Sequence, residues 1–556
     1  MSRMSSVVPS VALGLLLAGA LPAAEPDQVA RDEQTLREAK VGTDGPALLE
    51  FFRKRTAKDV DPTKIKALVR QLGDDSFEKR EQASAQLIAV GASAVPHLKE
   101  ALKDPDIEIV RRAEECLRRI GEGSTGAVVD AAARLLAARK PDGAAEALLA
   151  YLPYAEDDIA ADEVREALAA LAVRDGKVDP AVVNAAADKL PARRAAAATA
   201  LARSGIAQHR QTADKLLQDS DQTVRLHAAL GLAAAGEKKA VPVLIDLLAD
   251  LPPAQLGLPL ELLNRLAKDQ APALAPGKDP AARKKYRDAW AAWWAKNGGA
   301  TDLGKPAPAP KPLGYTMVVL LDQGRILELN EKNEERWRID GLQFPLDAQY
   351  LPNDRVLVAE QQANRVTERN LKGEIVWKKE VAEPLVAQRL LNGNTLIANR
   401  TEVIEVDRDG KELLRWNPSP NEQIMRAQRR GNGEILLVIQ SLETNTSRFV
   451  RLDPSASAEL QTFPVEVRTS GGRFEMLPDN RVLIPQLGNN RVVEYDRRGK
   501  VAWQLPVEQP IVALRLPNGN TLATSMTQNR AVELTREGKQ VWEYKSDSRV
   551  TRAFRR

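Results

Sequence analysis

Two patterns of hydrophobic and polar residues divide the chain, and one replaces the other near residue 313. From 26 to 299, apolar residues recur with a period near 3.6 in segments rich in Ala, Leu, Arg and Glu, which predicts amphipathic helices. After 313, short alternating runs of Val, Leu and Ile are separated by Asn-Gly, Asp-Asn and Asp-x-x-Gly turns. The sequence therefore predicts a helical half followed by a β-sheet half.

The helical half contains an internal repeat of two helices. The first part of segment 90–121 (VGASAVPHLKEALKDPDIEIVRRAEECLRRIG) recurs at 235–252, and its second part recurs at 219–236. In these copies a Gly ends one helix, Val-Pro opens the next, and paired Asp residues precede a Val-Arg. The pattern resembles HEAT repeats, which implies stacked helix pairs that bind partners along a concave surface. A rigid spacer is the alternative.

An aromatic stripe closes the helical half. In YRDAWAAWWAKNGG, the residues Tyr286, Trp290, Trp293 and Trp294 fall on one helix face. A stripe of this size has to be covered, so we expect it either to cap the last repeat or to dock the next domain. The Pro, Ala and Lys residues of 300–313 predict an extended linker after it.

Regularly spaced aromatic residues give the period of the β half. The outer strands of six units of about 40 residues are marked by Trp337, Trp377, Trp416, Phe463, Trp503 and Trp542. Four short strands in each unit predict a six-bladed β-propeller. The first unit lacks an inner strand, and the segment DSRVTRAFRR at the other end of the propeller supplies one. We therefore expect this C-terminal strand to close the ring.

Charge and the N-terminal residues narrow the function classes. The net charge of +4 is spread over 80 basic and 76 acidic residues, which argues against a nucleic-acid partner.

The opening MSRMSSVVPSVALGLLLAGALPAAEP predicts a signal peptide that is removed after Ala24. No later segment has 18 uninterrupted apolar residues, so we expect no membrane span and an exported protein, periplasmic or extracellular. Cys116 is the single cysteine, which excludes an intramolecular disulfide.

The blades resemble those of NHL, PQQ-repeat and arylsulfotransferase-like propellers. The order of signal peptide, HEAT repeats, linker and propeller resembles that of exported two-domain proteins predicted in planctomycete bacteria. The resemblance covers nearly all of the chain, and its motifs are structural. The predicted boundaries are a signal peptide at 1–24, an N-terminal helical segment at 25–59, a HEAT-like array at 60–299, a linker at 300–313 and a propeller at 314–556.

Residue usage bears on catalysis. The three histidines, His97, His209 and His227, lie in the helical half without metal-ligand spacing. Resemblance to arylsulfotransferase-like enzymes implies a catalytic His, and resemblance to PQQ dehydrogenases implies a calcium site and commonly a disulfide, yet the β half has no His or Cys. We assign no catalytic residue, no metal ligand and no cofactor. Chemistry by carboxylates alone stays open, because a ring brings together residues that spacing cannot identify.

The end of the second strand in each blade is a candidate ligand face. The equivalent positions hold Leu320, Glu360, Asn399, Gln440, Gln486 and Ser525. Amides and other polar groups dominate the ring, which suits a peptide or a glycan. The alternative is that polar residues stand there because the strand leaves the sheet.

Two rows of opposite charge recur in the third strands. One row holds Arg325, Arg365, Arg448, Arg491 and Arg530, with Glu402 in the third blade. Three residues later stand Glu328, Glu368, Glu405, Glu494 and Glu533, with Arg451 in the fourth blade. An offset of three places the rows on opposite faces of each sheet. We therefore expect an Arg of one blade to meet a Glu of the next in an inter-blade ladder.

Together these features favour a non-catalytic, exported interaction or scaffold protein. The helical array and the propeller face would bind a protein, a peptide or a glycan. One alternative is an enzyme at the propeller mouth that uses carboxylates, as a lyase, a hydrolase or a quinoprotein-like protein. Another is a purely structural component of the envelope. A cluster of buried carboxylates at the axis would favour the enzyme.

Overall fold

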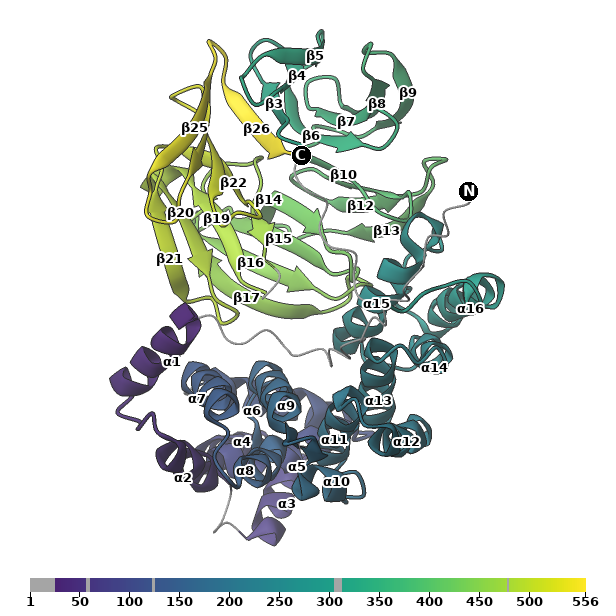
Figure 1. Cartoon of the computed structure of the whole chain (residues 1–556), viewed down its shortest axis with the longest axis vertical. Coiled ribbons are helices and arrows are strands. Elements are labelled where there is room, and N and C mark those ends of the chain that lie inside the picture. Colours follow the sequence, from purple (N-terminus) through teal and green to yellow (C-terminus); the bar gives the residue numbers. More distant parts are fainter. Residues whose placement is uncertain (1–25, 57–60, 123–125, 305–312, 478–479) are drawn as a thin grey trace, which may run out of the picture. The chain divides into compact units, whose positions relative to one another are not determined.

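The computed structural model describes residues 26–56, 61–122, 126–304, 313–477 and 480–556 (Figure 1). The predicted signal peptide and most of the predicted linker lie outside the described residues. The chain forms two compact units, one ending at Ala235 and the other beginning at Gly236. Among the described helices, none is long and apolar enough to cross a lipid bilayer.

The first unit is a series of short helices. They are α1 (Pro26–Glu38), α2 (Gly45–Arg55), α3 (Pro62–Gln71), α4 (Phe77–Val90), α5 (Val95–Ala101), α6 (Ile107–Glu122), α7 (Gly126–Arg139), α8 (Ala144–Tyr151), α9 (Asp158–Leu171), α10 (Pro180–Ala185), α11 (Pro191–Arg203), α12 (Ala207–Lys215) and α13 (Gln222–Ala234). A two-stranded hairpin of β1 (Val173–Arg174) and β2 (Lys177–Val178) follows α9. The helical half is thus a repeat array, as predicted.

Small residues and aspartate caps determine how these helices pack. The Asp221 carboxylate accepts hydrogen bonds from the amides of Thr223 and Val224 and so caps α13. Gly231 of α13 lies so close to α11 that a Cβ there would be 2.9 Å from the Cβ of Ala202. His227 belongs to the same helix, and burial lowers its pKa to about 3, so it packs as a neutral side chain.

The second unit begins with α14 (Ala240–Leu247), α15 (Gly257–Ala267) and α16 (Pro280–Asn297) and continues into the propeller. The aromatic stripe lies on α16, where Trp290 is fully buried and packs edge-to-face against Tyr286 and Trp293. The Asn264 amide of α15 donates to the carbonyl of Gly431 in a propeller turn at 2.8 Å. The division into compact units therefore falls before α14, not at the linker.

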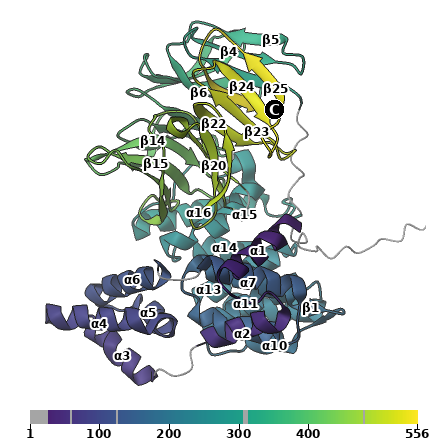
Figure 2. The same ribbon diagram turned by 90° about the vertical axis from the view of Figure 1, so that its left-hand side faces the viewer.

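Six four-stranded antiparallel sheets form the propeller (Figure 1, Figure 2). The strands of each blade are given from the inner to the outer one: blade 1 has β26 (Val550–Arg555), β3 (Thr316–Leu320), β4 (Arg325–Leu329) and β5 (Glu335–Ile339), and blade 2 has β6 (Pro345–Leu351), β7 (Arg355–Glu360), β8 (Arg365–Asn370) and β9 (Ile375–Glu380). Blade 3 has β10 (Val386–Arg389), β11 (Thr395–Ala398), β12 (Val403–Val406) and β13 (Glu412–Trp416), and blade 4 has β14 (Glu422–Arg429), β15 (Ile435–Ser441), β16 (Ser447–Leu452) and β17 (Glu459–Val465). Blade 5 has β18 (Glu475–Met476), β19 (Val482–Gln486), β20 (Arg491–Tyr495) and β21 (Val501–Pro506), and blade 6 has β22 (Pro510–Arg515), β23 (Thr521–Ser525), β24 (Arg530–Leu534) and β25 (Gln540–Lys545).

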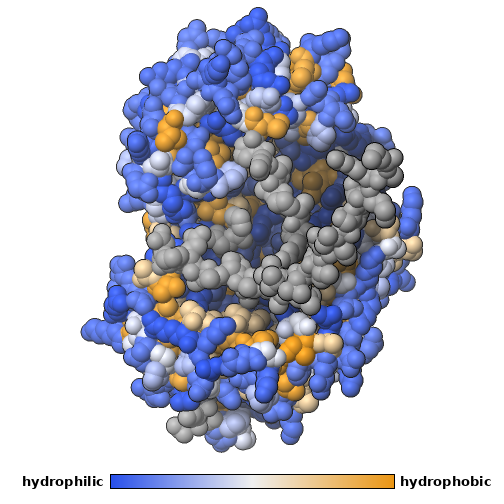
Figure 3. All heavy atoms as spheres, viewed as in Figure 1, coloured by the Kyte–Doolittle hydropathy of each residue, from blue (hydrophilic) through white to orange (hydrophobic). Residues whose placement is uncertain are grey.

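The ring closes as predicted. Strand β26 pairs antiparallel with β3, in a register that places Val550 opposite Leu320 and Arg555 opposite Thr316. Strands in the middle of a blade are buried on both faces because each blade packs between two others, whereas outer strands such as β9 are largely exposed. The face of the propeller seen in Figure 3 carries mainly hydrophilic residues, with hydrophobic ones scattered singly.

Candidate functional site

The structure buries the predicted ligand-face residues inside the blades. Glu360, Gln486 and Ser525 have no exposed surface, and Asn399 and Gln440 are 5% and 4% exposed. Each stands at or next to the end of a second strand, as expected from the repeat. Their polar atoms therefore face the protein interior and do not form an open ring.

Most of these side chains are held by partners in their own blade. The Glu360 carboxylate accepts hydrogen bonds from Arg369 and Thr367 at 2.7 Å and from Arg365 at 3.2 Å. Burial acts to raise the pKa of Glu360, but these hydrogen bonds outweigh it and lower the pKa below its ordinary value. The Gln486 amide accepts from Arg491 at 2.8 Å.

The two shallower positions follow the same pattern. The side-chain oxygen of Asn399 accepts from the backbone amides of Thr401 and Glu402, both at 2.9 Å, which shapes the turn after β11. The Gln440 amide donates to Asn445 at 2.7 Å in the next loop. Both contacts shape turns, which agrees with the alternative that polar residues stand there because the strand leaves the sheet.

Blade 1 differs because Leu320 has no polar group. Leu320 lies directly opposite Arg325, in the register that joins Glu360 to Arg365 and Gln486 to Arg491. Arg325 therefore turns away and donates to Asp340 at 2.5 Å and Gln323 at 3.2 Å.

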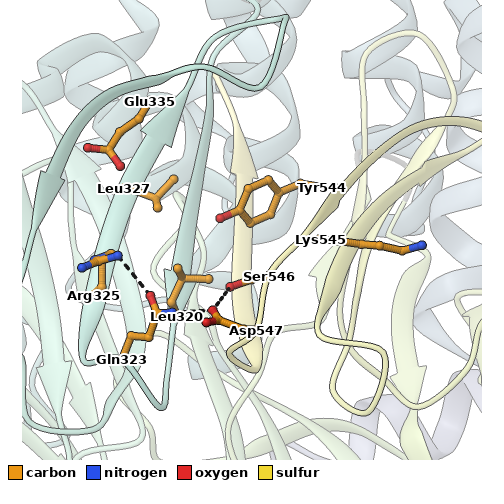
Figure 4. Close-up of a pocket in the computed structure, with 9 residues that line it drawn as sticks. All are labelled: Leu320, Gln323, Arg325, Leu327, Glu335, Tyr544, Lys545, Ser546 and Asp547. Atoms are coloured by element: carbon orange, nitrogen blue, oxygen red, sulfur yellow. Dashed lines mark hydrogen bonds between the residues drawn. The ribbon is translucent and has the colours of Figure 1, made fainter.

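A hollow of about 420 Å³, which we call the seam hollow, opens beside Arg325 at the seam of blades 6 and 1 (Figure 4). It is lined by Leu320, Gln323, Arg325, Leu327, Glu335, Tyr544, Lys545, Ser546 and Asp547. The only sequence signal for the seam hollow was Leu320, which is the one apolar residue among the six equivalent positions at the ends of the second strands.

The arginine row of the third strands pairs mainly within blades, although Arg491 also lies 3.9 Å from Glu466, just after the outer strand of blade 4. Arg365 bonds Glu360, Arg448 bonds Glu422 at 3.1 Å, and Arg530 bonds Glu543 at 2.7 Å. Arg325 and Arg491 likewise meet Asp340 and Gln486. The predicted ladder therefore needs correction, since the shortest contacts of these arginines are to residues of their own blades.

Four glutamates of the second row reach the next blade, through arginines at the ends of the inner strands, whereas Glu328 pairs with Arg336 and Arg556 of its own blade. The contacts between blades are Glu368–Arg389 at 2.8 Å, Glu405–Arg429 at 3.2 Å, Glu494–Arg515 at 2.8 Å and Glu533–Arg555 at 2.8 Å. In blade 4 the Glu is replaced by Arg451, and the facing position of blade 5 holds Met476. The sequence signal was an Arg just before each Asn-Gly turn, as in RLLNGN and RLPNGN.

A tryptophan packs on three of these inner-strand arginines. We call the Glu–Arg pair between two blades, with the tryptophan that covers it, the blade connector. The guanidinium of Arg389 lies over the Trp377 ring at 4.8 Å, and those of Arg515 and Arg555 lie over Trp503 and Trp542 at 4.5 and 4.6 Å. Trp377 also donates its indole N–H to the carbonyl of Arg408 in the next blade at 2.8 Å. The repeated Trp is thus a fixed part of the blade interface.

At the axis, the connection between β17 and β18 crosses the ring; we call residues 470–474 the axial crossing. Gly471 donates to the carbonyl of Met425 in blade 4 at 3.0 Å, and Arg473 donates to that of Ile511 in blade 6 at 3.1 Å. The Arg473 guanidinium bonds Asp347 of blade 2 at 2.9 Å. Protein atoms of all six blades therefore meet at this level of the axis, because Asp347 also pairs with Arg552 of blade 1 at 3.2 Å and Arg400 of blade 3 donates to Ser470 at 2.8 Å.

Two axial carboxylates are held by this arrangement. Asp347 is 2% exposed between Arg473 and Arg552. Glu475 accepts the backbone amide of Arg515 at 2.5 Å, and burial raises the pKa of its carboxyl above the ordinary value. Within the described residues, no group of three or more His, Cys, Asp and Glu side chains has the arrangement of a metal site.

Comparison with known proteins gives one family match. A model of HEAT repeats matches residues 180–256, which extend from α10 past α14. No curated protein matches the chain.

Among solved structures, a protein of unknown function from Bacteroides caccae is 14% identical, with a TM-score of 0.29 over 42% of this chain and 73% of that one. A streptogramin B lyase is 15% identical, with a TM-score of 0.29 over 37% of this chain and 69% of that one. A chain of a nidogen/laminin complex is 10% identical, with a TM-score of 0.35 over 42% of this chain and 95% of that one.

Proposed function

We propose that the protein is an exported, non-catalytic interaction scaffold, in which the HEAT-type array binds a protein partner and the propeller offers a second binding surface. The observation that carries the proposal is the use of the buried carboxylates. Glu368, Glu405, Glu494 and Glu533 each join an arginine of the next blade. These groups stabilise the platform and are not free for chemistry.

The pKa of Glu360 supports a structural role for this buried acid. A general acid or base for neutral pH needs a pKa near that pH, which for a carboxyl means a strongly raised one. The pKa of Glu360 is instead lowered by its arginine partners. The helical half supports the binding role, since stacked repeats present extended concave surfaces to partner chains.

The test is capture of a partner with the tagged mature chain, from residue 25 onward, in the periplasm or medium of its own source, followed by cross-linking and mass spectrometry. We expect a recurrent protein partner whose cross-links fall in the helical unit, including the matched segment 180–256. Tag alone and a chain unfolded before capture serve as controls. Recovery of no partner and no glycan, or of partners that the unfolded chain captures equally, would contradict the proposal.

Export is a separate part of the proposal. When the full chain is expressed with its own N-terminus, we expect the exported form to begin at Glu25. N-terminal sequencing of the periplasmic or extracellular fraction measures this directly. A full-length chain that stays in the cytoplasm with Met1 intact would refute export.

A carboxylate enzyme is the second candidate, and Glu475 is the observation that favours it. Its raised pKa and its place on the inner strand β18, directly after the axial crossing, are features of a general acid. A screen of hydrolase and lyase substrates tests this candidate. Turnover by the native chain that is lost in Glu475→Gln and retained in the exposed control Glu380→Gln would establish it.

A further inference from the structure

The seam hollow lies where blade 6 meets blade 1. One wall comes from Tyr544 and the residues after it, and the other comes from blade 1 (Figure 4). Leu320 and Leu327, which are 2% and 4% exposed, lie at the base. In Figure 4 the Tyr544 ring projects into the hollow, whereas the Lys545 ammonium points away from it.

Two substitutions within the repeat account for the hollow. The position of Tyr544 is held in blades 1 and 5 by Ile339 and Leu505, which are 1% and 3% exposed and fill the seam to the next blade. The position of Leu320 is held in blade 2 by Glu360, which binds the arginine opposite it. At the seam of blades 6 and 1, Tyr544 packs against the cluster that contains Leu320 but stays only partly buried, and Leu320 has no polar group for Arg325, so space remains between Tyr544 and Arg325.

The charged groups around the hollow are already engaged. Arg325, Glu335 and Asp547 line it, whereas the Lys545 ammonium points away and lies 3.4 Å from the Glu543 carboxylate. Arg325 is paired with Asp340, and Asp547 accepts from Gln323 at 2.5 Å. A charged ligand would have to break these pairs and would meet a like charge nearby, whereas a neutral ligand would not.

The lining offers both hydrogen-bonding groups and an apolar surface. Gln323, Ser546 and Glu335 supply donors and acceptors. Burial raises the pKa of Tyr544, so its hydroxyl stays protonated near neutral pH and can donate. The Tyr544 ring and the two leucines provide apolar contact, and about 420 Å³ lies within the range of roughly 300–1,000 Å³ usual for small-molecule sites.

We propose that the seam hollow binds a neutral saccharide unit, whose C–H face packs on Tyr544 and whose hydroxyls bond Gln323, Ser546 and Glu335. A sugar ring combines an apolar face with neutral hydroxyls at its edge, which is the combination that this lining serves. The inference deepens the binding role proposed for the propeller by naming a ligand class, and it rests on that role.

The test uses the mature full chain on an array of neutral oligosaccharides (cello-, xylo-, manno-, malto-, galacto- and chito-oligosaccharides) alongside sulfated and uronic-acid probes. Titration calorimetry then follows the best-bound neutral probe. We expect Tyr544→Ala to weaken binding about tenfold or more and Gln323→Ala to weaken it several-fold. Tyr544→Phe keeps the ring and is expected to lose less than Tyr544→Ala.

Gln528→Ala is the matched control. Gln528 occupies the same place in the β23–β24 loop of blade 6 as Gln323 does in the β3–β4 loop of blade 1, and it does not line the hollow. It is expected to bind like the native chain, and thermal unfolding checks that every variant is folded.

Three results would overturn the inference. These are no binding of any neutral probe, binding that Tyr544→Ala and Gln323→Ala leave unchanged, and binding of the charged probes only. Partner capture by the helical unit is scored separately, so failure of the saccharide site and failure of the scaffold function are distinguishable.

Discussion

Arg389 lies between the ring of Trp377 and the carboxylate of Glu368, and only 8% of its surface is exposed. Burial lowers the pKa of its guanidinium to about 10, which still leaves it charged at neutral pH. A charge held this far from water depends on its partner, because an unpaired buried charge is costly. Loss of one partner should therefore cost much more than loss of the pair.

Removing one half of this connector tests that dependence. We expect Arg389→Leu to lower the free energy of unfolding by about 3–5 kcal/mol, because Glu368 then keeps only its partly exposed partner Arg408. The double variant Arg389→Leu/Glu368→Leu is expected to regain most of the loss. Urea unfolding followed by tryptophan fluorescence measures both.

Arg408→Ala is the control for that experiment. Its side chain is 56% exposed and bonds the same Glu368 carboxylate at 2.7 Å. Solvent screens such a pair, so we expect a loss below about 1 kcal/mol. A loss as large as that of Arg389→Leu would show that burial does not govern the connector.

Glu360 gives a pH-dependent prediction. Its pKa in the folded chain is lowered by Arg369, Thr367 and Arg365, so its contribution to stability is present above the unfolded pKa of about 4.3 and lost as the pH falls through the folded pKa. We expect the stability difference between the native chain and Glu360→Gln to be constant near neutral pH and to shrink below about pH 4.

Urea unfolding between pH 7 and pH 3 measures this difference, and Glu380→Gln, on the exposed outer strand β9, controls for the substitution itself. A difference that grows toward low pH would mean that burial outweighs the hydrogen bonds at Glu360.

At the scale of single residues, the sequence predicted the glutamate of the blade connector but not its arginine. The period of the blades identified Glu368 and its equivalents, and the strand offset placed them on a blade-facing surface. The arginine partners were not predicted, because they stand on the inner strand of the next blade. Which strand of that blade approaches the glutamates depends on how the blades are inclined to one another. Arg389 stands just before a turn of blade 3, and periodicity, which describes one blade at a time, gives it no partner in blade 2.

At the scale of the elements, the repeat period did not predict the axial crossing. Phe463 and Trp503 are separated by the ordinary repeat length, so the unit looked regular. Within it, Gly471 and Gly472 both have positive φ, and the chain leaves the sheet and shortens β18 to two residues. The closing strand β26, in contrast, was predictable, because unit 1 lacked an inner strand and the C-terminal segment matched one.

Gly472 is the residue on which the crossing depends. A Cβ at this position would lie 2.1 Å from the carbonyl oxygen of Ile511, and φ is +75°. We expect Gly472→Ala to destabilise the chain by more than the roughly 1–3 kcal/mol of backbone strain alone, because the neighbouring backbone also has to move.

Gly519→Ala separates the two effects. Gly519 has φ of +85° and no atom within 4 Å of an added Cβ, so it reports strain without a clash. Thermal unfolding of both variants gives the comparison. Equal losses of stability in the two variants would mean that the backbone around Gly472 moves to accept a Cβ at little cost.

For the whole molecule, the position of the unit boundary has a measurable consequence. The last helices contact the propeller through Asn264 and through Gly257, whose added Cβ would be 3.1 Å from the Glu434 carboxylate. We therefore expect a fragment of 236–556 to unfold at a higher temperature than one of 300–556. Scanning calorimetry measures both, and identical transition temperatures would show that the helices add nothing to propeller stability.

The sequence placed this boundary at the linker because composition changes there. The aromatic stripe of α16 left two possibilities open, and neither periodicity nor charge chooses between them. Helix packing against a sheet edge depends on shape, as at Gly257 and the turn around Gly431, and such fits are invisible in a single sequence.

The pairing of β26 with β3 also sets an order of events during synthesis. Arg549 and its partner Asp322 are 227 residues apart, so β3 is complete long before the strand that covers it has been made. At about 5–20 residues per second, the ribosome needs on the order of 10–45 s to bridge that interval. Throughout it, the apolar strand TMVVL keeps an unpaired edge, which is the state in which nascent chains join one another. The yield of folded protein should therefore fall as translation slows between the first blade and the last, even though the finished ring has no open inner seam.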